Sequence, residues 1–183
     1  MLKKPRKFLS DMILKRLFPI FTAVAILVLP SCLGKEDKIN DYSEWRELNT
    51  NYFDSLANAT IDGHLVYQEI KPDWDKSFSI LMRWHNEDRN PSFVTPLSTS
   101  TCIVNYTLTN ISGDTLDSSA GYSCVPNKMI TGFMAALTNM RVNDTVTAVI
   151  PYTAGYGVYG SGAVYPYSTL IFGIRLDSIS RLM

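Results

Sequence analysis

Three segments in the second half of the chain alternate apolar and polar side chains, and this pattern limits the fold more than any other feature. They run from Cys102 to Leu108, from Thr145 to Ile150 and from Thr169 to Leu176. Alternation with a period of two is typical of strands that bury one face of a sheet. We therefore expect a sheet with one apolar face, on which Tyr106 lies.

Two further strands and one short helix complete the core elements that the sequence predicts. Runs of aromatic and β-branched residues predict strands from His64 to Ile70 and from Phe78 to Trp84. Helical spacing predicts a helix at about Gly132 to Met140. Several strands with one short helix indicate an α+β fold, in which an antiparallel sheet is wrapped on the helix.

An extra N-terminal helix is expected over residues 41–60. Asp41 and Glu44 have the spacing of a capping box at its start. Apolar residues three and four positions apart predict one buried stripe along it. The members of this stripe are Trp45, Leu48, Tyr52, Phe53 and Leu56.

Residues 1–31 have the order of a secretory signal peptide, beginning at Met1 or at Met12. A basic segment precedes 13 uncharged apolar residues, Leu17 to Leu29, and the small residue Ser31 follows shortly after them. The apolar run is shorter than the roughly 20 residues of a membrane-spanning helix. We therefore expect removal of this segment rather than permanent anchoring through it.

Cys32 directly follows this segment, and Leu29-Pro30-Ser31-Cys32 resembles the lipobox of bacterial lipoproteins. That resemblance implies acylation of Cys32, a tether over residues 32–40 and a place on the outer membrane, facing the periplasm or the cell surface. The short tag Lys35-Glu36-Asp37 resembles surface-export signals. The alternative is an ordinary cleaved signal with a chance cysteine.

The charge of the remaining chain argues against a nucleic-acid partner. Six of the 17 Lys and Arg and one of the 17 Asp and Glu lie before Cys32, which leaves 11 positive and 16 negative side chains, a net charge of −5. No basic patch with interleaved aromatic residues occurs. The two histidines, His64 and His85, lie outside any zinc-binding spacing, so we expect no metal and no cofactor.

Cys102 and Cys124 are the remaining cysteines of the chain. An oxidising compartment allows them to form a disulfide, but we expect two buried free thiols. Spacing alone does not decide between these, because a bridge needs Cα atoms within about 7 Å.

Three ordered segments resemble the signatures of FKBP-type peptidyl-prolyl isomerases, a likeness that covers residues 99–177. Val104 to Thr107, followed by Gly113 to Ser119, resemble the first signature, and Met129 to Phe133 resemble the entry to the family's helix. The last signature is matched by Ile150-Pro151, Tyr156-Gly157 and Pro166-Tyr167-Ser168-Thr169-Leu170-Ile171-Phe172.

The resemblance implies an FKBP-like domain over residues 61–183, with a half-barrel sheet wrapped on the helix and an aromatic cleft between them. The catalytic positions it implies are Tyr106, Asp117, Phe133, Tyr156 and Phe172. The substrate-binding positions it implies are Leu116, Met129, Ile130 and Val164. Leu116 stands where the family usually has Phe, Phe133 where it usually has Trp, and the segment after Asp117 is shortened, with Tyr122 as a candidate wall.

The resemblance also implies a folding catalyst for exported, proline-containing proteins, with macrolides as possible inhibitors. The departures at Leu116 and Phe133 leave a second hypothesis, an FKBP-like chaperone or binding module with weak or no turnover. A third hypothesis is a surface lipoprotein that binds a solute or a glycan. It is suggested by Tyr152, Tyr156, Tyr159, Tyr165 and Tyr167.

Overall fold

The computed structural model describes residues 42–86, 91 and 94–180. The predicted signal peptide 1–31, Cys32 and the tether 32–40 lie outside the described residues, so these stay predictions. The domain boundary at residue 61 also stays a prediction.

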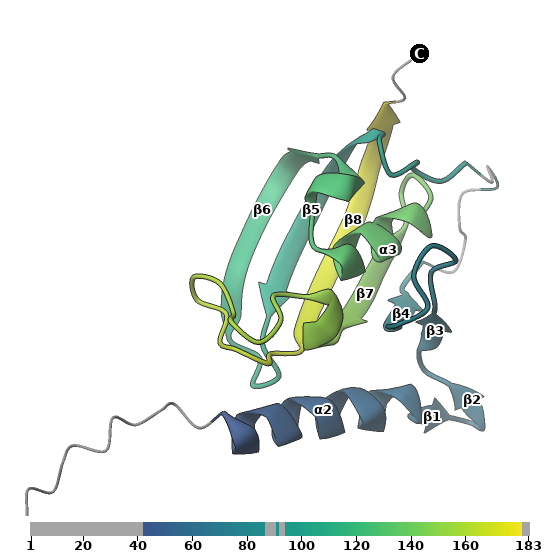
Figure 1. Ribbon diagram of the computed structural model, residues 1–183. Coiled ribbons are helices and arrows are strands. Elements are labelled where there is room, and N and C mark those ends of the chain that lie inside the picture. Colours follow the sequence, from purple (N-terminus) through teal and green to yellow (C-terminus); the bar gives the residue numbers. More distant parts are fainter. Residues whose placement is uncertain (1–41, 87–90, 92–93, 181–183) are drawn as a thin grey trace, which may run out of the picture. The chain divides into compact units, whose positions relative to one another are not determined.

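A six-stranded antiparallel sheet dominates the described part of the chain (Figure 1). The order of its strands is β3-β4-β7-β8-β5-β6. Strand β4 therefore lies beside β7, and β5 beside β8, although neither pair is consecutive in the sequence. The strands in this order are Gln68–Ile70, Ile80–Trp84, Thr145–Ile150, Leu170–Ser180, Thr101–Thr109 and Thr115–Cys124. The predicted α+β fold with an antiparallel sheet is confirmed.

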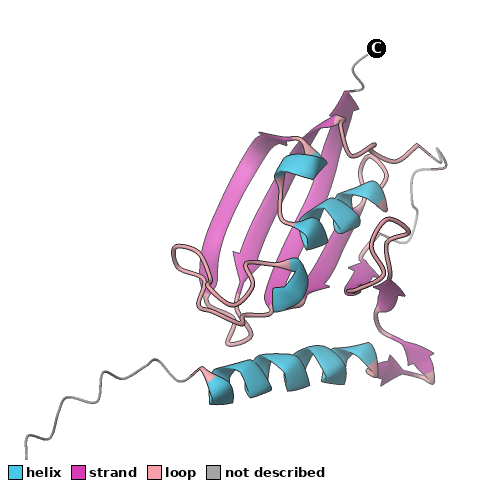
Figure 2. Cartoon of the chain, viewed as in Figure 1, coloured by secondary structure: helices cyan, strands magenta, loops and turns pink. Residues whose placement is uncertain are grey.

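Helix α3 (Thr131–Thr138) lies on one face of this sheet, and two short 3₁₀ helices, η1 (Pro126–Lys128) and η2 (Tyr152–Ala154), flank it (Figure 2). A Cβ at Gly132 would overlap the side chain of Ile150. Only glycine therefore allows the start of α3 to approach the end of β7 so closely. We call the sheet face beneath α3 the core face and the opposite one the outer face.

Strand β6 was not predicted, and its composition explains why. Nine of its ten residues are exposed or half-buried, because it is the edge strand and is rich in Ser, Gly and Thr. A strand of this kind has no apolar alternation to detect. The predicted strand from His64 to Ile70 is also divided. Its first two residues form β2 (His64–Leu65), which pairs with β1 (Thr60–Ile61), and its last three form β3.

The N-terminal helix α2 (Ser43–Ala57) is present, but its buried face differs from the predicted stripe. Leu48 is 52% exposed, whereas Asn49 is fully buried. Tyr42 caps the helix without a side-chain hydrogen bond, and Asp41 of the expected capping box lies outside the described residues. Within the described ranges, no helix is long and apolar enough to cross a membrane.

Cys102 and Cys124 face each other as register partners on β5 and β6. Both thiols are free and buried. Burial raises the pKa of Cys102 from 9.0 to about 11, and the neighbouring Cys124 adds to that increase. The pairing depends on register shifts within the ladder, which the spacing in the sequence does not reveal.

Candidate active site

Three aromatic rings from three different elements meet on the core face. Phe133 of α3 and Phe172 of β8 are almost fully buried, and their ring centroids lie 5.0 Å apart. The ring of Tyr106, on β5, lies 6.2 Å from that of Phe133 and 6.1 Å from that of Phe172. The strand register brings them together, because Tyr106 pairs with Ile174 and Leu108 with Phe172, so all four side chains share one face.

Asp117 on β6 binds the hydroxyl of Tyr106, which donates a hydrogen bond of 2.7 Å to its Oδ2 atom. Burial raises the pKa of Tyr106 well above its usual range, and the hydrogen bond to Asp117 raises it further. The phenol is therefore a protonated donor at neutral pH. Tyr122 extends this group, with its ring 5.6 Å from that of Tyr106.

Tyr156 lies on the loop between β7 and β8, residues 151–169. Burial raises the pKa of Tyr156, and the charges of Asp117 and Tyr122 add to the increase. The charge of Asp117 therefore raises the pKa of both the Tyr106 and the Tyr156 hydroxyl. Val164, on the same loop, is buried in the core cluster that contains Phe133 and Phe172.

The loop 151–169 is held by helix α2. Asn49 accepts a hydrogen bond of 2.7 Å from the N–H of Thr169, and the Thr169 hydroxyl donates to the Asn49 carbonyl. Trp45 donates from Nε1 to the hydroxyl of Ser168. The guanidinium of Arg46 lies over the Tyr152 and Tyr167 rings, with centroids 5.7 and 5.2 Å away.

A short backbone turn supports the same loop from inside. Gly160 has a φ of +70°, and a Cβ there would overlap the backbone carbonyl of Val164. Glycine is thus required for the close approach that positions Val164. Ser161 and Val164 close the turn with two backbone hydrogen bonds of 2.9 Å.

The remaining predicted residues pack against the hydrophobic core that contains two of the three rings. Met129 and Ile130 precede α3, are half-buried and pack against the core. The Ile130 N–H has no acceptor among the residues that the structure describes, so it can donate to a bound carbonyl. Leu116 has no register partner, because a bulge lies between the Thr109–Thr115 and Leu108–Asp117 pairs. A bulge re-aims side chains, and Leu116 too packs against the core.

The structure thus joins Tyr106, Asp117, Phe133 and Phe172 through ring contacts and one hydrogen bond. Leu116, Met129, Ile130 and Val164 lie in or against the same hydrophobic core, and the roles of the nine residues stay predictions. Sequence reasoning missed the contribution of Asn49, because a single polar residue inside an apolar stripe gives no signal for burial. The five loop tyrosines do not form one surface. Tyr152 and Tyr167 stack beneath Arg46, whereas Tyr159 is 89% exposed.

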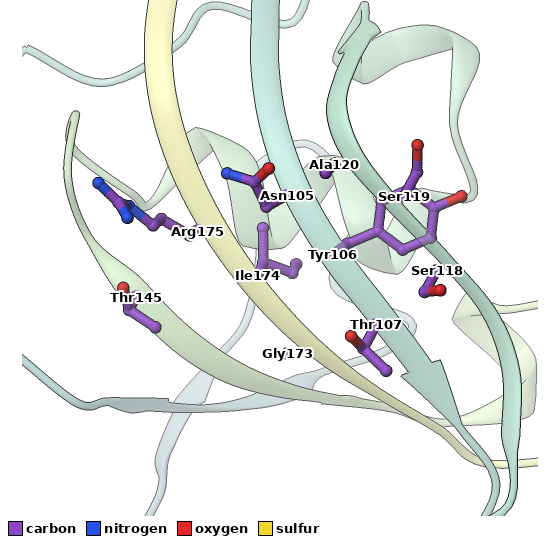
Figure 3. A pocket seen from close by; sticks show the side chains of 10 residues that line it. All are labelled: Asn105, Tyr106, Thr107, Ser118, Ser119, Ala120, Thr145, Gly173, Ile174 and Arg175. Carbon is purple, nitrogen blue, oxygen red and sulfur yellow. The ribbon is translucent and has the colours of Figure 1, made fainter.

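A hollow lies on the outer face of the same strands (Figure 3). Its volume is about 590 Å³, and it is lined by the side chains of Asn105, Thr107 and Arg175 and by the exposed backbone of Gly173. Asn105 and Arg175 both contact Asp177. The residues that line this hollow do not include a cluster of aromatic rings.

No group of three or more metal-ligating side chains occurs among the described residues. The chemistry available at the core-face cluster is therefore that of aromatic rings, a hydrogen-bonded Tyr–Asp pair and a backbone N–H donor.

Comparisons with known proteins point to one family. The family model of FKBP-type peptidyl-prolyl cis-trans isomerases matches residues 94–177. Residues 94–177 are an FKBP-type domain. This segment contains every member of the ring cluster described above.

Individual relatives agree with this assignment. The macrophage infectivity potentiator of Trypanosoma cruzi is 46% identical over 55 residues, which are 30% of this chain and 28% of that protein. The chain thus matches under a third of that relative's length.

Two solved structures have the same fold. A peptidyl-prolyl cis-trans isomerase from Pseudomonas syringae pv. tomato aligns with a TM-score of 0.64 at 22% identity, covering 76% of this chain and 96% of that one. FkpA from Escherichia coli aligns with a TM-score of 0.64 at 18% identity, covering 97% of this chain and 75% of that one. The first alignment includes nearly the whole of its partner, so the FKBP fold is present in full.

Proposed function

We propose that this protein is a peptidyl-prolyl cis-trans isomerase that acts on exported proteins. The observation that carries the proposal is the cluster of Tyr106, Phe133 and Phe172 with the Tyr106–Asp117 hydrogen bond, within the segment that the FKBP family model matches. The reaction needs no nucleophile and no cofactor. Those side chains are sufficient for it.

The chemistry follows from the electronic structure of the amide. Rotation about an X–Pro bond crosses a barrier of roughly 18–20 kcal/mol because amide resonance is lost. The planar amide is more charge-separated than the twisted one, so an apolar environment favours the twisted form. A prolyl ring held against Phe133 and Phe172 is stabilised most in that form, which is the condition for catalysis.

Polar groups at the edge of the cluster orient the substrate. The N–H of Ile130 is placed to donate to a carbonyl next to the proline, and the Tyr156 hydroxyl to a second carbonyl. Asp117 fixes the Tyr106 ring through its hydrogen bond. Because the Tyr106 pKa is raised, this ring stays neutral and the site carries no phenolate at neutral pH.

An isomerase assay tests the proposal. Full-length protein purified in detergent is expected to accelerate cis-trans exchange of a proline peptide, measured by coupling the trans form to a protease. Tyr156→Phe is expected to lower the rate about tenfold, and Tyr159→Phe, a matched change at an exposed tyrosine, to leave it unchanged. A macrolide is expected to inhibit. Equal rates in the presence and absence of the protein would overturn the proposal.

The second candidate is a chaperone with little turnover. Its support is the row of exposed side chains on the loop 151–169, where Val158 is 43%, Tyr159 89% and Tyr165 62% exposed. Such side chains bind unfolded segments without catalysis. A protein that suppresses aggregation of an unfolded client but gives no isomerase rate would establish this candidate instead.

Location follows as a separate proposal, from Cys32 and the signal-like segment before it. An acylated Cys32 would hold the domain at the outer membrane, near clients that have just crossed the inner membrane. Labelling of growing cells with a radioactive fatty acid is expected to mark the wild type and not Cys32→Ala. Label retained in Cys32→Ala would refute the anchor and leave the isomerase proposal standing.

A further inference from the structure

A small pocket lies where α2 meets the loop 151–169 and the turn between β5 and β6. Its volume is about 190 Å³. The residues that line it and carry the argument are Trp45, Asn110, Asp114, Leu116, Ala163 and Tyr165. Trp45 comes from α2, so an FKBP fold without this helix would lack one wall.

The pocket adjoins the hydrophobic core that also contains Phe133 and Phe172. Leu116 lines the pocket and also packs against the core cluster that contains Phe172. Ala163 and Tyr165 line it too, and Val164 between them is buried in the same cluster. Consecutive Cα atoms of a peptide are 3.8 Å apart. If its proline lies against the ring cluster, a bound polypeptide would bring a neighbouring side chain toward this pocket.

Its walls combine aromatic faces with a negative charge. The Trp45 and Tyr165 rings meet edge to face, with centroids 6.2 Å apart and an interplanar angle of 85°. The indole N–H of Trp45 donates to the hydroxyl of Ser168, and the Asn110 amide donates to Asp114 Oδ2 at 2.9 Å. Among the described residues, no Lys, Arg or His forms an ion pair with Asp114.

We propose that this pocket is a subsite for a lysine or arginine side chain that flanks the proline of the substrate. The aliphatic stem would pack on Leu116 and the two rings, and the cationic head would face Asp114. Aromatic rings and a carboxylate both attract a cation, and long cationic side chains can bury their stems on apolar surfaces. The inference rests on the proposed function for the identity of the bound polypeptide and adds a sequence preference to it.

The experiment uses full-length protein in detergent and proline peptides in which each flanking residue is replaced in turn by Lys, Leu or Glu. Isomerisation is measured as kcat/KM, and direct binding of the same peptides by calorimetry. At one flanking position, Lys is expected to exceed Glu by about fivefold in both measurements. The ratio is expected to decrease at high salt, because the carboxylate is exposed to solvent.

Two variants test the walls separately. Asp114→Asn removes the charge but keeps an oxygen to accept from Asn110, and Trp45→Leu removes the ring. Each is expected to bring the Lys-to-Glu ratio close to one. Asp54→Asn, an equal change of charge on the exposed side of α2, is the matched control and is expected to keep the wild-type ratio.

The outcomes separate the two proposals. Isomerisation of all peptides without a preference for Lys, or a preference that survives in Asp114→Asn, would overturn the subsite and leave the isomerase function intact. Preferential binding of the Lys peptide that is lost in Asp114→Asn, without any isomerisation, would support the subsite and overturn the catalytic function.

Discussion

The two faces of one sheet differ sharply, although the same strands build both. On the core face, Tyr106 and Phe172 meet Phe133 of α3. On the outer face, one position along each strand, Asn105 and Gly173 line a hollow of about 590 Å³ that is larger than the pocket beside the cleft. The larger hollow lies on the face that lacks the ring cluster, so a hollow alone does not indicate function.

The difference lies in what encloses each face. The core face is covered by α3 and by the loop 151–169, which α2 holds through Asn49 and Trp45. A covered apolar site excludes water and so favours a twisted, less polar amide. The outer hollow has polar side chains already engaged with one another, for example Asn105 and Arg175 with Asp177, and it stays open to solvent. We therefore expect catalysis on the core face only.

The largest effect is expected from truncating a side chain on the core face. Phe172→Ala should lower the free energy of unfolding by about 3–5 kcal/mol, because Phe172 is 5% exposed, and should remove isomerase activity. Phe172→Leu keeps most of the volume and should lower the rate while the protein stays folded. Arg175→Ala on the outer face should change stability by less than about 0.5 kcal/mol. Urea denaturation and the isomerase assay measure both. Equal losses of stability and of isomerase activity in Phe172→Ala and Arg175→Ala would contradict the proposed difference between the two faces.

A smaller effect is expected from the anchor of the loop. Asn49→Ala removes the side-chain oxygen that accepts from the buried N–H of Thr169, which should cost about 1–3 kcal/mol, whereas the Thr169 hydroxyl keeps the backbone carbonyl of residue 49. It should raise KM more than it lowers kcat, because Tyr156 and Val164 lose their fixed positions while the rings remain. Asn51→Ala, at an exposed position of the same helix, is the control. An unchanged KM in folded Asn49→Ala would show that α2 does not position the loop.

The inward-facing residues of the core face could be predicted well from the sequence, whereas edge strand β6 and the docking of α2 could not, for physical reasons. Alternation in β5, β7 and β8 follows directly from the pleat, so the inward direction of Tyr106 and Phe172 could be read from the spacing. Edge strand β6 has no such pattern. The docking of α2 depends on a polar anchor, Asn49, whose partner Thr169 lies 120 positions away in the sequence. Leu48 was wrongly expected to be buried, because the apolar spacing of the helix does not show that its neighbour Asn49 is the docked residue.

Removing one hydroxyl from the core face should have a modest effect. Tyr106→Phe keeps the ring but loses the hydrogen bond to Asp117, which should lower stability by about 1 kcal/mol and the isomerase rate a few fold. Tyr159→Phe removes a hydroxyl from a side chain that is 89% exposed and should change neither quantity. A full rate in Tyr106→Phe would remove the Tyr–Asp pair from the mechanism.

A separate effect, confined to alkaline pH, concerns the buried thiols of Cys102 and Cys124 at the end of the core face. The unfolded chain ionises its cysteines near pH 9, whereas the folded state keeps Cys102 protonated to about pH 11. The unfolded state therefore loses protons first, and stability should decrease as the pH rises from 9 to 11. Urea titrations at several pH values measure this slope. The double variant Cys102→Ala, Cys124→Ala should have a shallower slope; an identical slope would show that the thiols do not contribute.

The most direct test of the central claim is NMR exchange spectroscopy on a proline peptide with a small amount of full-length protein in detergent. We predict exchange cross-peaks between the cis and trans forms, together with contacts from the prolyl ring to the rings of Phe133 and Phe172. Exchange no faster than in the free peptide, or prolyl contacts to the face of Asn105 and Arg175, would contradict the account.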